Sequence, residues 1–230
     1  MLIIHDARLP LPIIQTLHTY GTCIAFISKD ITHQPLAGHP DLFFCPIDKQ
    51  LIAAPNTPPE YLQKLDELNL PFMFGKTKVG FQKQQNTAYN VVVSEHYIIH
   101  NGTCTDTVIK EYKGEREFLH VKQAFTRCSL LPLQNDNFLT SDQGIANIIE
   151  SHSLPYCYVH PDEIVLPGYK NGFVGGCMGV YKNKVFICGH LDFHPEGKKI
   201  NIFLANLGYE VIELYRGPLF DGGSLVLLDG

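Results

Sequence analysis

The 230-residue sequence lacks several features that would place it in a common class. No apolar run approaches the ~20 residues that a membrane-spanning helix needs, and Asp6 and Arg8 stand where a secretory signal would be apolar. Lys and Arg number 18 against 23 Asp and Glu, so the formal charge is −5 and there is no excess of cations for nucleic-acid phosphates. We therefore expect a soluble, cytoplasmic protein with neither a membrane nor a nucleic acid as partner.

The cysteines also lack the spacing of a metal site or a disulfide framework. Their number is odd, no Cys-x-x-Cys pair occurs, and the seven are scattered over positions 23, 45, 104, 128, 157, 177 and 188. Free thiols in a reducing compartment follow. The sequence has neither the glycine fingerprint of a dinucleotide site nor the Gly-x-Ser-x-Gly of a serine hydrolase, and we expect no cofactor. With 45% hydrophobic and 18% charged residues, the composition is globular, and we expect one domain over residues 1–230.

What the sequence does contain is a weak repeat of short hairpins. Four pairs of β-prone runs flank polar turns, at residues 42–46 with 51–54, 90–93 with 97–99, 130–133 with 138–140, and 178–181 with 185–188. The second runs begin at successive separations of 46, 41 and 47 residues. A fifth hairpin at the same spacing appears when the chain ends are joined, from residues 224–228 through Asp229-Gly230 to residues 2–5.

A helix and a third strand are expected after each hairpin. Helices are predicted over residues 10–20, from a capping box at 57–60, over 142–150 and over 196–207, each followed by a short β-prone run, whereas the segment 107–123 is the least clear. Five strand-strand-helix-strand units predict a closed α/β propeller whose first strands line an axial channel, because closure removes exposed sheet edges. An ordinary α+β protein with hairpins at similar spacing is the alternative.

Three short motifs strengthen the propeller interpretation through a family resemblance. They are Phe173-Val174-Gly175-Gly176-Cys177-Met178-Gly179, Gly189-His190-Leu191-Asp192 and Asp221-Gly222-Gly223-Ser224-Leu225. With the repeat, they resemble the penteins, the fivefold propellers of the guanidino-group modifying enzymes: arginine and agmatine deiminases, dimethylarginine dimethylaminohydrolase and amidinotransferases. The resemblance is to a distant branch of that superfamily, and it implies a single pentein-like domain.

The resemblance also implies roles for particular residues. His190 matches the general acid/base of the enzymes, and Asp192 matches a guanidinium-binding carboxylate. The glycine-rich motif at Asp221 leads in the enzymes to a nucleophilic cysteine, but this sequence continues Leu225-Val226-Leu227. A covalent thiouronium intermediate needs a thiolate, which those side chains do not supply.

Cys177 and the segment 190–194 also carry groups with chemistry of their own. Cys177 follows two glycines at the start of an inner strand, so it could replace the missing nucleophile beside His190, or it could be a small buried hydrophobe. If residues 190–194 are extended, His190, Asp192 and His194 point the same way and could fix a tautomer, although no ligand pattern supports a metal and none is expected. A surface loop is the alternative.

Substrate-binding groups are expected at Asp221, Ser224 and Asn90, next to the axis, although ordinary turn chemistry explains them as well. The sequence thus predicts a polar small-molecule site in the channel, with a guanidino compound as a candidate ligand. The alternative is a Cys-dependent hydrolase or transferase, acting on a guanidino or amide substrate with Cys177, His190 and Asp192. A third is a structural propeller whose channel is plugged by apolar side chains. Catalytic activity and oligomeric state stay open.

Overall fold

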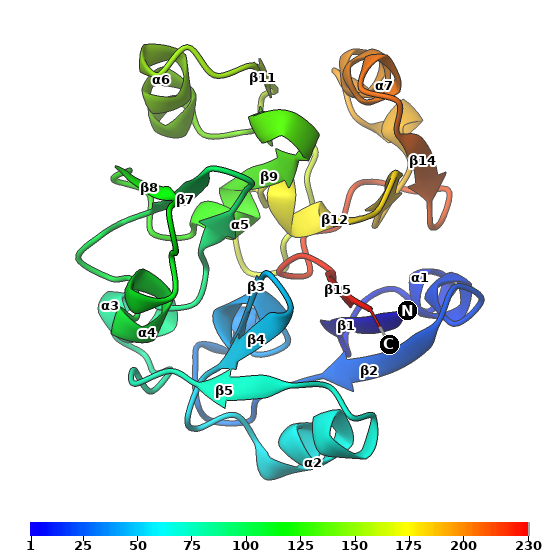
Figure 1. Ribbon diagram of the computed structural model, residues 1–230. Coiled ribbons are helices and arrows are strands. Elements are labelled where there is room, and N and C mark those ends of the chain that lie inside the picture. Colours follow the sequence, from blue (N-terminus) through cyan, green and yellow to red (C-terminus); the bar gives the residue numbers. More distant parts are fainter. Residues whose placement is uncertain (230) are drawn as a thin grey trace.

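The computed structural model describes residues 1–229, in which five three-stranded sheets surround a central axis (Figure 1). Within each sheet the first strand pairs antiparallel with the second, and the second pairs parallel with the third. The sheets, in this order of strands, are β15 (Val226–Leu228), β1 (Leu2–Asp6) and β2 (Thr22–Phe26); β3 (Phe44–Ile47), β4 (Gln50–Ala53) and β5 (Phe72–Phe74); β6 (Val92–Val93), β7 (Tyr97–His100) and β8 (Glu117–His120); β9 (Leu130–Leu133), β10 (Asn137–Thr140) and β11 (Tyr156–Tyr158); and β12 (Met178–Tyr181), β13 (Lys184–Ile187) and β14 (Glu210–Glu213).

A helix joins the second strand to the third in every unit and lies outside the sheets (Figure 1). These helices are α1 (Leu11–Leu17), α2 (Pro59–Glu67), α4 (Thr107–Glu111), α6 (Gln143–Ser151) and α7 (Gly197–Asn206). Shorter turns of helix occur in the connections: α3 (Lys83–Asn86), α5 (Thr126–Ser129), η1 (Gln34–Leu36), η2 (Pro40–Leu42), η3 (Gln134–Asp136), η4 (Gly175–Cys177) and η5 (Leu191–Phe193). No helix within residues 1–229 combines the length and the apolar character needed to cross a membrane.

The predicted joining of the chain ends is confirmed. Strand β1 pairs antiparallel with β15, with Leu2 opposite Leu228 and Ile4 opposite Val226. All five residues of β1 are buried, since this strand is the middle one of its sheet. Gly230, which was predicted in the turn of this hairpin, lies outside the described residues.

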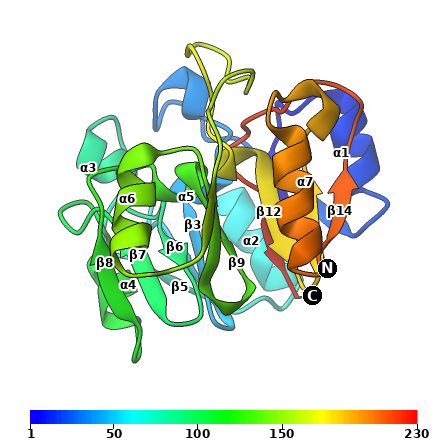
Figure 2. The ribbon, with the colours of Figure 1, turned by 90° about the horizontal axis from the view of Figure 1, so that it is seen from above.

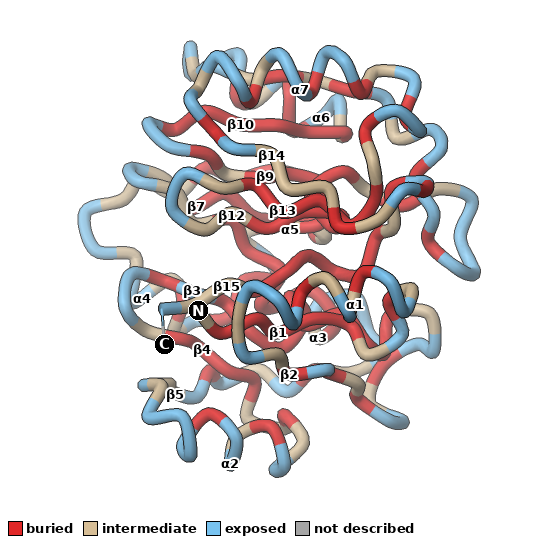
Figure 3. Tube along the Cα trace, turned by 90° about the vertical axis from the view of Figure 1, so that its right-hand side faces the viewer, coloured by how far each residue is buried: buried red, intermediate tan, exposed pale blue. Residues whose placement is uncertain are grey.

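The first strands of the five units form the inner wall of the propeller. β15 contacts both β3 and β12, and β9 contacts both β6 and β12. Buried residues fill the middle of the molecule, whereas exposed residues lie along the outer helices and loops (Figure 3). We call the centre of the ring, where the segments leading into these inner strands converge, the hub.

The interactions at the helix ends agree only in part with the predictions from the sequence. Asp142 caps α6, since its carboxylate accepts a hydrogen bond from the Ile145 backbone at 2.8 Å. The capping box expected before α2 is wrong, because the Thr57 hydroxyl donates to the Ala54 carbonyl at 2.8 Å and makes no bond to the helix. Helix α4 escaped clear prediction because it has only five residues and one buried side chain, Ile109.

Candidate functional site

Five buried polar side chains meet at the hub, each from a segment that leads into an inner strand. His39 and Asp41 precede β3, Asn90 precedes β6, Cys128 lies in α5 before β9, and Asp221 precedes β15. None of the five is more than 2% exposed. We call this group the hub site.

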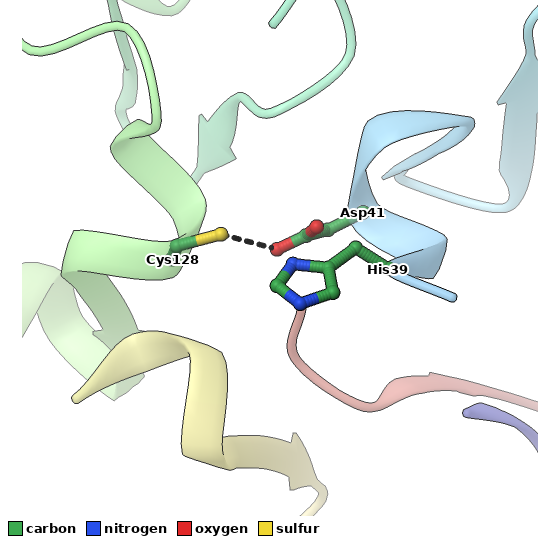
Figure 4. Close-up of side chains that lie close together, drawn as sticks. All are labelled: His39, Asp41 and Cys128. Carbon is green, nitrogen blue, oxygen red and sulfur yellow. Dashed lines mark hydrogen bonds between the residues drawn. The ribbon is translucent and has the colours of Figure 1, made fainter. Parts of the chain in front are cut away.

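The thiol of Cys128 has two hydrogen-bond partners within the hub site. It donates to Oδ2 of Asp41 at 3.0 Å and accepts from the side-chain amide of Asn90 at 3.3 Å (Figure 4 shows the contact with Asp41). The carbonyl oxygen of Asn90 in turn accepts from the backbone amides of Arg127 at 2.8 Å and Cys128 at 3.3 Å. Asn90 therefore fixes both the loop that carries the thiol and the direction of the thiol itself.

The imidazole of His39 lies beside this pair and has no partner of its own. Neither ring nitrogen, and likewise Oδ1 of Asp41, forms a hydrogen bond within residues 1–229. One donor atom each from His39, Asp41 and Cys128 lies within 4.8 Å of the others (Figure 4). An unpaired buried polar atom costs about 1–3 kcal/mol, so a bound water or ligand at these three atoms would offset that cost.

Glycines make room for this arrangement. A Cβ atom on Gly223 would lie 2.3 Å from the side chain of His39, and the positive φ of 69° at Gly223 favours glycine in any case. A Cβ on Gly176 would lie 1.9 Å from the carboxylate of Asp221. Two of the glycine-rich motifs thus place the imidazole and the carboxylate at the hub.

The electrostatics of the hub site favour a cation. Burial raises the pKa of Asp41 to about 6, although His39 opposes the shift, and burial likewise raises the pKa of Asp221. Burial, followed by the negative charges of Asp41 and Asp221, raises the pKa of the Cys128 thiol well above its usual value. The neighbouring Arg127 guanidinium is occupied, since it donates to the carbonyls of Gly175 and Met178 at 2.9 and 3.0 Å. A bound cation would relieve the repulsion between the carboxylates and make the thiolate easier to form.

Cavities open on both sides of the hub site. On the side of the long loops, a cavity of about 250 Å³ is bounded by His39, Cys128 and Asp221 together with apolar residues. The segment between β11 and η4, drawn olive to yellow, rises at this end beside the blue segment between β2 and β3 (Figure 2). On the strand side, a cavity of about 150 Å³ is lined by Asp41, Arg127, Ser224 and residues of all five inner strands. Apolar side chains of the inner strands make up most of the lining of the strand-side cavity, whereas the hub site itself is polar.

Comparison with known proteins agrees with this architecture. Residues 4–226 match the sequence model of a family of unknown function (DUF6873). The chain belongs to that family. None of the curated protein sequences matches this DUF6873 protein.

Solved structures identify the fold of this DUF6873 protein. It is similar to a dimethylarginine dimethylaminohydrolase (DDAH) from Pseudomonas aeruginosa in complex with citrulline, with 10% identity, a TM-score of 0.54 and coverage of 92% of this chain and 91% of that one. An amidinotransferase from Microseira wollei has 10% identity, a TM-score of 0.58 and coverage of 92% and 87%. The agmatine deiminase of C. jejuni has 8% identity, a TM-score of 0.57 and coverage of 92% and 86%. The chain therefore has the pentein fold, as the resemblance implied.

The predicted substrate-binding residues lie near the axis in three different settings. Asp221 is at the loop-side cavity, where its carboxylate accepts from the backbone amides of Phe173 at 2.8 Å and Gly223 at 3.0 Å. Asn90 is used within the protein to hold Cys128. Ser224 is buried and borders the strand-side cavity.

The predicted catalytic residues occupy separate places in this DUF6873 protein. Cys177 is fully buried, its thiol donates to the Phe173 carbonyl at 3.3 Å, and burial raises its pKa well above the usual value. His190 and Asp192 border a surface cavity of about 520 Å³, where the imidazole lies 3.1 Å from Glu213 and 3.5 Å from Asp192. Across residues 1–229, no hydrogen bond joins the Cys177 thiol to either of them.

The extended conformation expected for residues 190–194 is wrong. Leu191–Phe193 forms the short helix η5, because Nδ1 of His190 accepts the backbone amide of Asp192 at 3.2 Å and caps the turn. His194 is buried separately, with its ring bonded to the His160 carbonyl and the Glu196 amide, both at 3.1 Å. The alternating side chains therefore do not share one face.

Sequence reasoning missed His39 and Cys128. The available signal for Cys128 was positional, since Asn90, Cys128 and Ser224 each stand two residues before an inner strand.

The thiol, imidazole and carboxylate of Cys128, His39 and Asp41 are also ligand types that zinc accepts, so a transition metal could compete with a substrate for these atoms.

Proposed function

We propose that this pentein binds a small guanidinium-bearing molecule at the hub site and modifies it through the thiol of Cys128, as a hydrolase or a transferase. The observation that carries the proposal is the buried cluster in which the Cys128 thiol lies 3.0 Å from Asp41, beside an imidazole with two unpartnered nitrogens. The thiol of Cys128, the imidazole of His39 and the carboxylate of Asp221 border one cavity, which supplies a nucleophile, a proton acceptor and an anion for thiol catalysis.

Binding is supported by the charges around the loop-side cavity. A guanidinium ion is planar and presents five or more N–H donors, and it needs carboxylate acceptors in a fixed plane. Asp221 borders this cavity, and Oδ1 of Asp41 has no partner in the described chain. The similar solved structures are named for dimethylarginine, agmatine and amidino transfer, which agrees with a ligand of this class.

The chemistry follows from the pKa of the thiol. A bound cation offsets the carboxylate charges that, after burial, raise the pKa of Cys128, and the thiol proton can pass to His39. The thiolate attacks the central guanidinium carbon, and the C–N bond to the leaving amine breaks as that nitrogen takes the proton from His39. In a hydrolase, water then attacks the central carbon of the covalent thiouronium; in a transferase, a second amine does so. The product leaves as the C–S bond breaks, and the Cys128 thiol is restored.

Cys128 takes the role of nucleophile that the alternative hypothesis from the sequence assigned to Cys177. Cys177 has a backbone carbonyl as its hydrogen-bond partner, whereas Cys128 has a carboxylate, an amide and a neighbouring imidazole. A ligand-binding protein without turnover is the second candidate function, because burial keeps the Cys128 thiol protonated until a cation arrives.

Two matched electrophiles test the proposal. 2-Chloroacetamidine is cationic and 2-chloroacetamide is its neutral analogue, so their relative rates of protein alkylation report on cation recognition at a thiol. We expect the cationic reagent to react at least ~10-fold faster, equivalent to about 1.4 kcal/mol. Asp221→Asn should lose most of this preference, whereas Asp192→Asn, at an exposed position, should keep it.

Two results would overturn the proposal. One is equal reactivity of both reagents with the intact protein, and the other is an unchanged rate in Cys128→Ser. Release of ammonia, urea or amine from guanidino compounds then separates an enzyme from a binding protein, since the binding protein shows cation preference at Cys128 and no product.

A further inference from the structure

The wall of the loop-side cavity constrains what a hub-site ligand can carry besides its cationic head. Outside the hub-site residues, the cavity is bounded mainly by side chains without charge: Leu36, Phe125, Leu166, Tyr169 and Phe173. Leu36 and Leu166 are buried, whereas Tyr169 is about half exposed and stands at the rim. A substituent that enters this space meets hydrocarbon and aromatic rings.

No lysine or arginine borders this cavity in the part of the chain that the structure describes. Arg8 borders the neighbouring cavity, which shares His39 and Asp221. Its guanidinium donates to both carboxylate oxygens of Asp6, at 2.9 and 2.6 Å, and to the carbonyls of Gln34 and Pro35, at 2.6 and 2.9 Å. Four of its five N–H groups are therefore used within the protein.

The second nearby guanidinium, that of Arg127, does not border the loop-side cavity. Arg127 borders the strand-side cavity and donates to the carbonyls of Gly175 and Met178. Apart from His39, the remaining charges near the hub are negative, since Asp6, Asp41 and Asp221 all contribute to the local field. A carboxylate in the loop-side cavity would be desolvated and repelled by Asp221, and the imidazole on the described wall, His39, is already the proton acceptor of the proposed reaction.

We infer that the ligand is a guanidine with an uncharged, largely apolar substituent and no carboxylate, so that free amino acids such as arginine are excluded. This inference rests on the proposed function, because it assumes that the cationic head sits at Asp221. The cavity volume of about 250 Å³ lies below the ~300–1,000 Å³ typical of drug-sized ligands, so the substituent is short.

A matched pair of guanidines tests the inference by calorimetric titration of the intact protein. 1-Butylguanidine and 4-guanidinobutanoate have chains of equal length and differ at the terminal carbon, which is a methyl group in one and a carboxylate in the other. We expect 1-butylguanidine to bind at least ~10-fold more tightly, because only the carboxylate must be buried without a partner. Equal or tighter binding of 4-guanidinobutanoate would overturn the inference and leave the proposed function intact.

An added cation provides the reciprocal test. Asn171 borders the same cavity, so Asn171→Arg should narrow or reverse the preference for 1-butylguanidine, while Asn171→Gln should keep it. An unchanged preference in Asn171→Arg would contradict the charge-based explanation. If neither guanidine binds the intact protein, the proposed function itself fails, and this outcome is distinct from loss of selectivity.

Discussion

Replacing Asp41 by Asn should stabilise the protein, and by an amount that depends on pH. Burial raises the pKa of this carboxyl from 3.8 to about 6, so its ionised form is disfavoured in the folded state. Between these two values the folded protein holds a proton that the unfolded chain has released. Stability therefore falls as pH rises through this window and stays lower above it.

The shift sets the size of the effect. Two pKa units correspond to about 3 kcal/mol at ~1.4 kcal/mol per unit, so Asp41→Asn should raise the free energy of unfolding by up to about 3 kcal/mol at pH 7.5. The gain should shrink to about 0.5 kcal/mol near pH 4 and disappear below about pH 3, where the carboxyl is protonated in both states. Asparagine keeps an oxygen that can accept the Cys128 thiol, so the hydrogen bond at 3.0 Å has a substitute.

Urea denaturation of the wild-type and variant proteins between pH 4 and 7.5 measures this difference. Only the difference is diagnostic, because buried His100, whose pKa is lowered to about 4, makes stability rise with pH in both proteins. Asp192→Asn serves as the exposed control and should change nothing. An Asp41→Asn variant that is less stable at pH 7.5, or whose difference does not vary with pH, would refute the reasoning.

Further predictions concern the ring and the thiol. Ile3→Ala should cost about 2–5 kcal/mol in urea denaturation, because the fully buried Ile3 lies in the strand that closes the ring, whereas exposed Leu11→Ala should cost little. Asp142→Ala should lower the unfolding free energy by about 1 kcal/mol through loss of the α6 cap. Asn90→Ala should slow alkylation by 2-chloroacetamidine, since the thiol loses a 3.3 Å contact, and an unchanged rate would refute its positioning role. Zinc ions should protect Cys128 from the same reagent, as measured by labelling rates with and without chelator, because three suitable donor atoms lie within 4.8 Å.

The propeller could be predicted from sequence because its information is local and periodic. Each hairpin is a pair of adjacent β-prone runs, and closure needed only the observation that residues 224–228 and 2–5 complete the series. The pairing of Ile4 with Val226 is the consequence. Details that depend on single hydrogen bonds, such as the absent capping box at Thr57, did not follow from the same patterns.

The site could be predicted only in part because its members are distant in sequence. Asp41 and Cys128 touch only when the ring brings their loops to the hub, and no motif links them. The glycines before Cys177 drew attention to that thiol, but Gly176 provides space for Asp221. His190 carried the family pattern, yet in this chain its imidazole lies beside Glu213 at a surface cavity.

Peptide mapping by mass spectrometry after limited alkylation with 2-chloroacetamidine tests the central claim most directly. We expect Cys128, one of the seven cysteines, to carry the adduct, and 1-butylguanidine to suppress its formation. An adduct on Cys177, or labelling spread over several cysteines without protection, would contradict a reactive thiol at the hub.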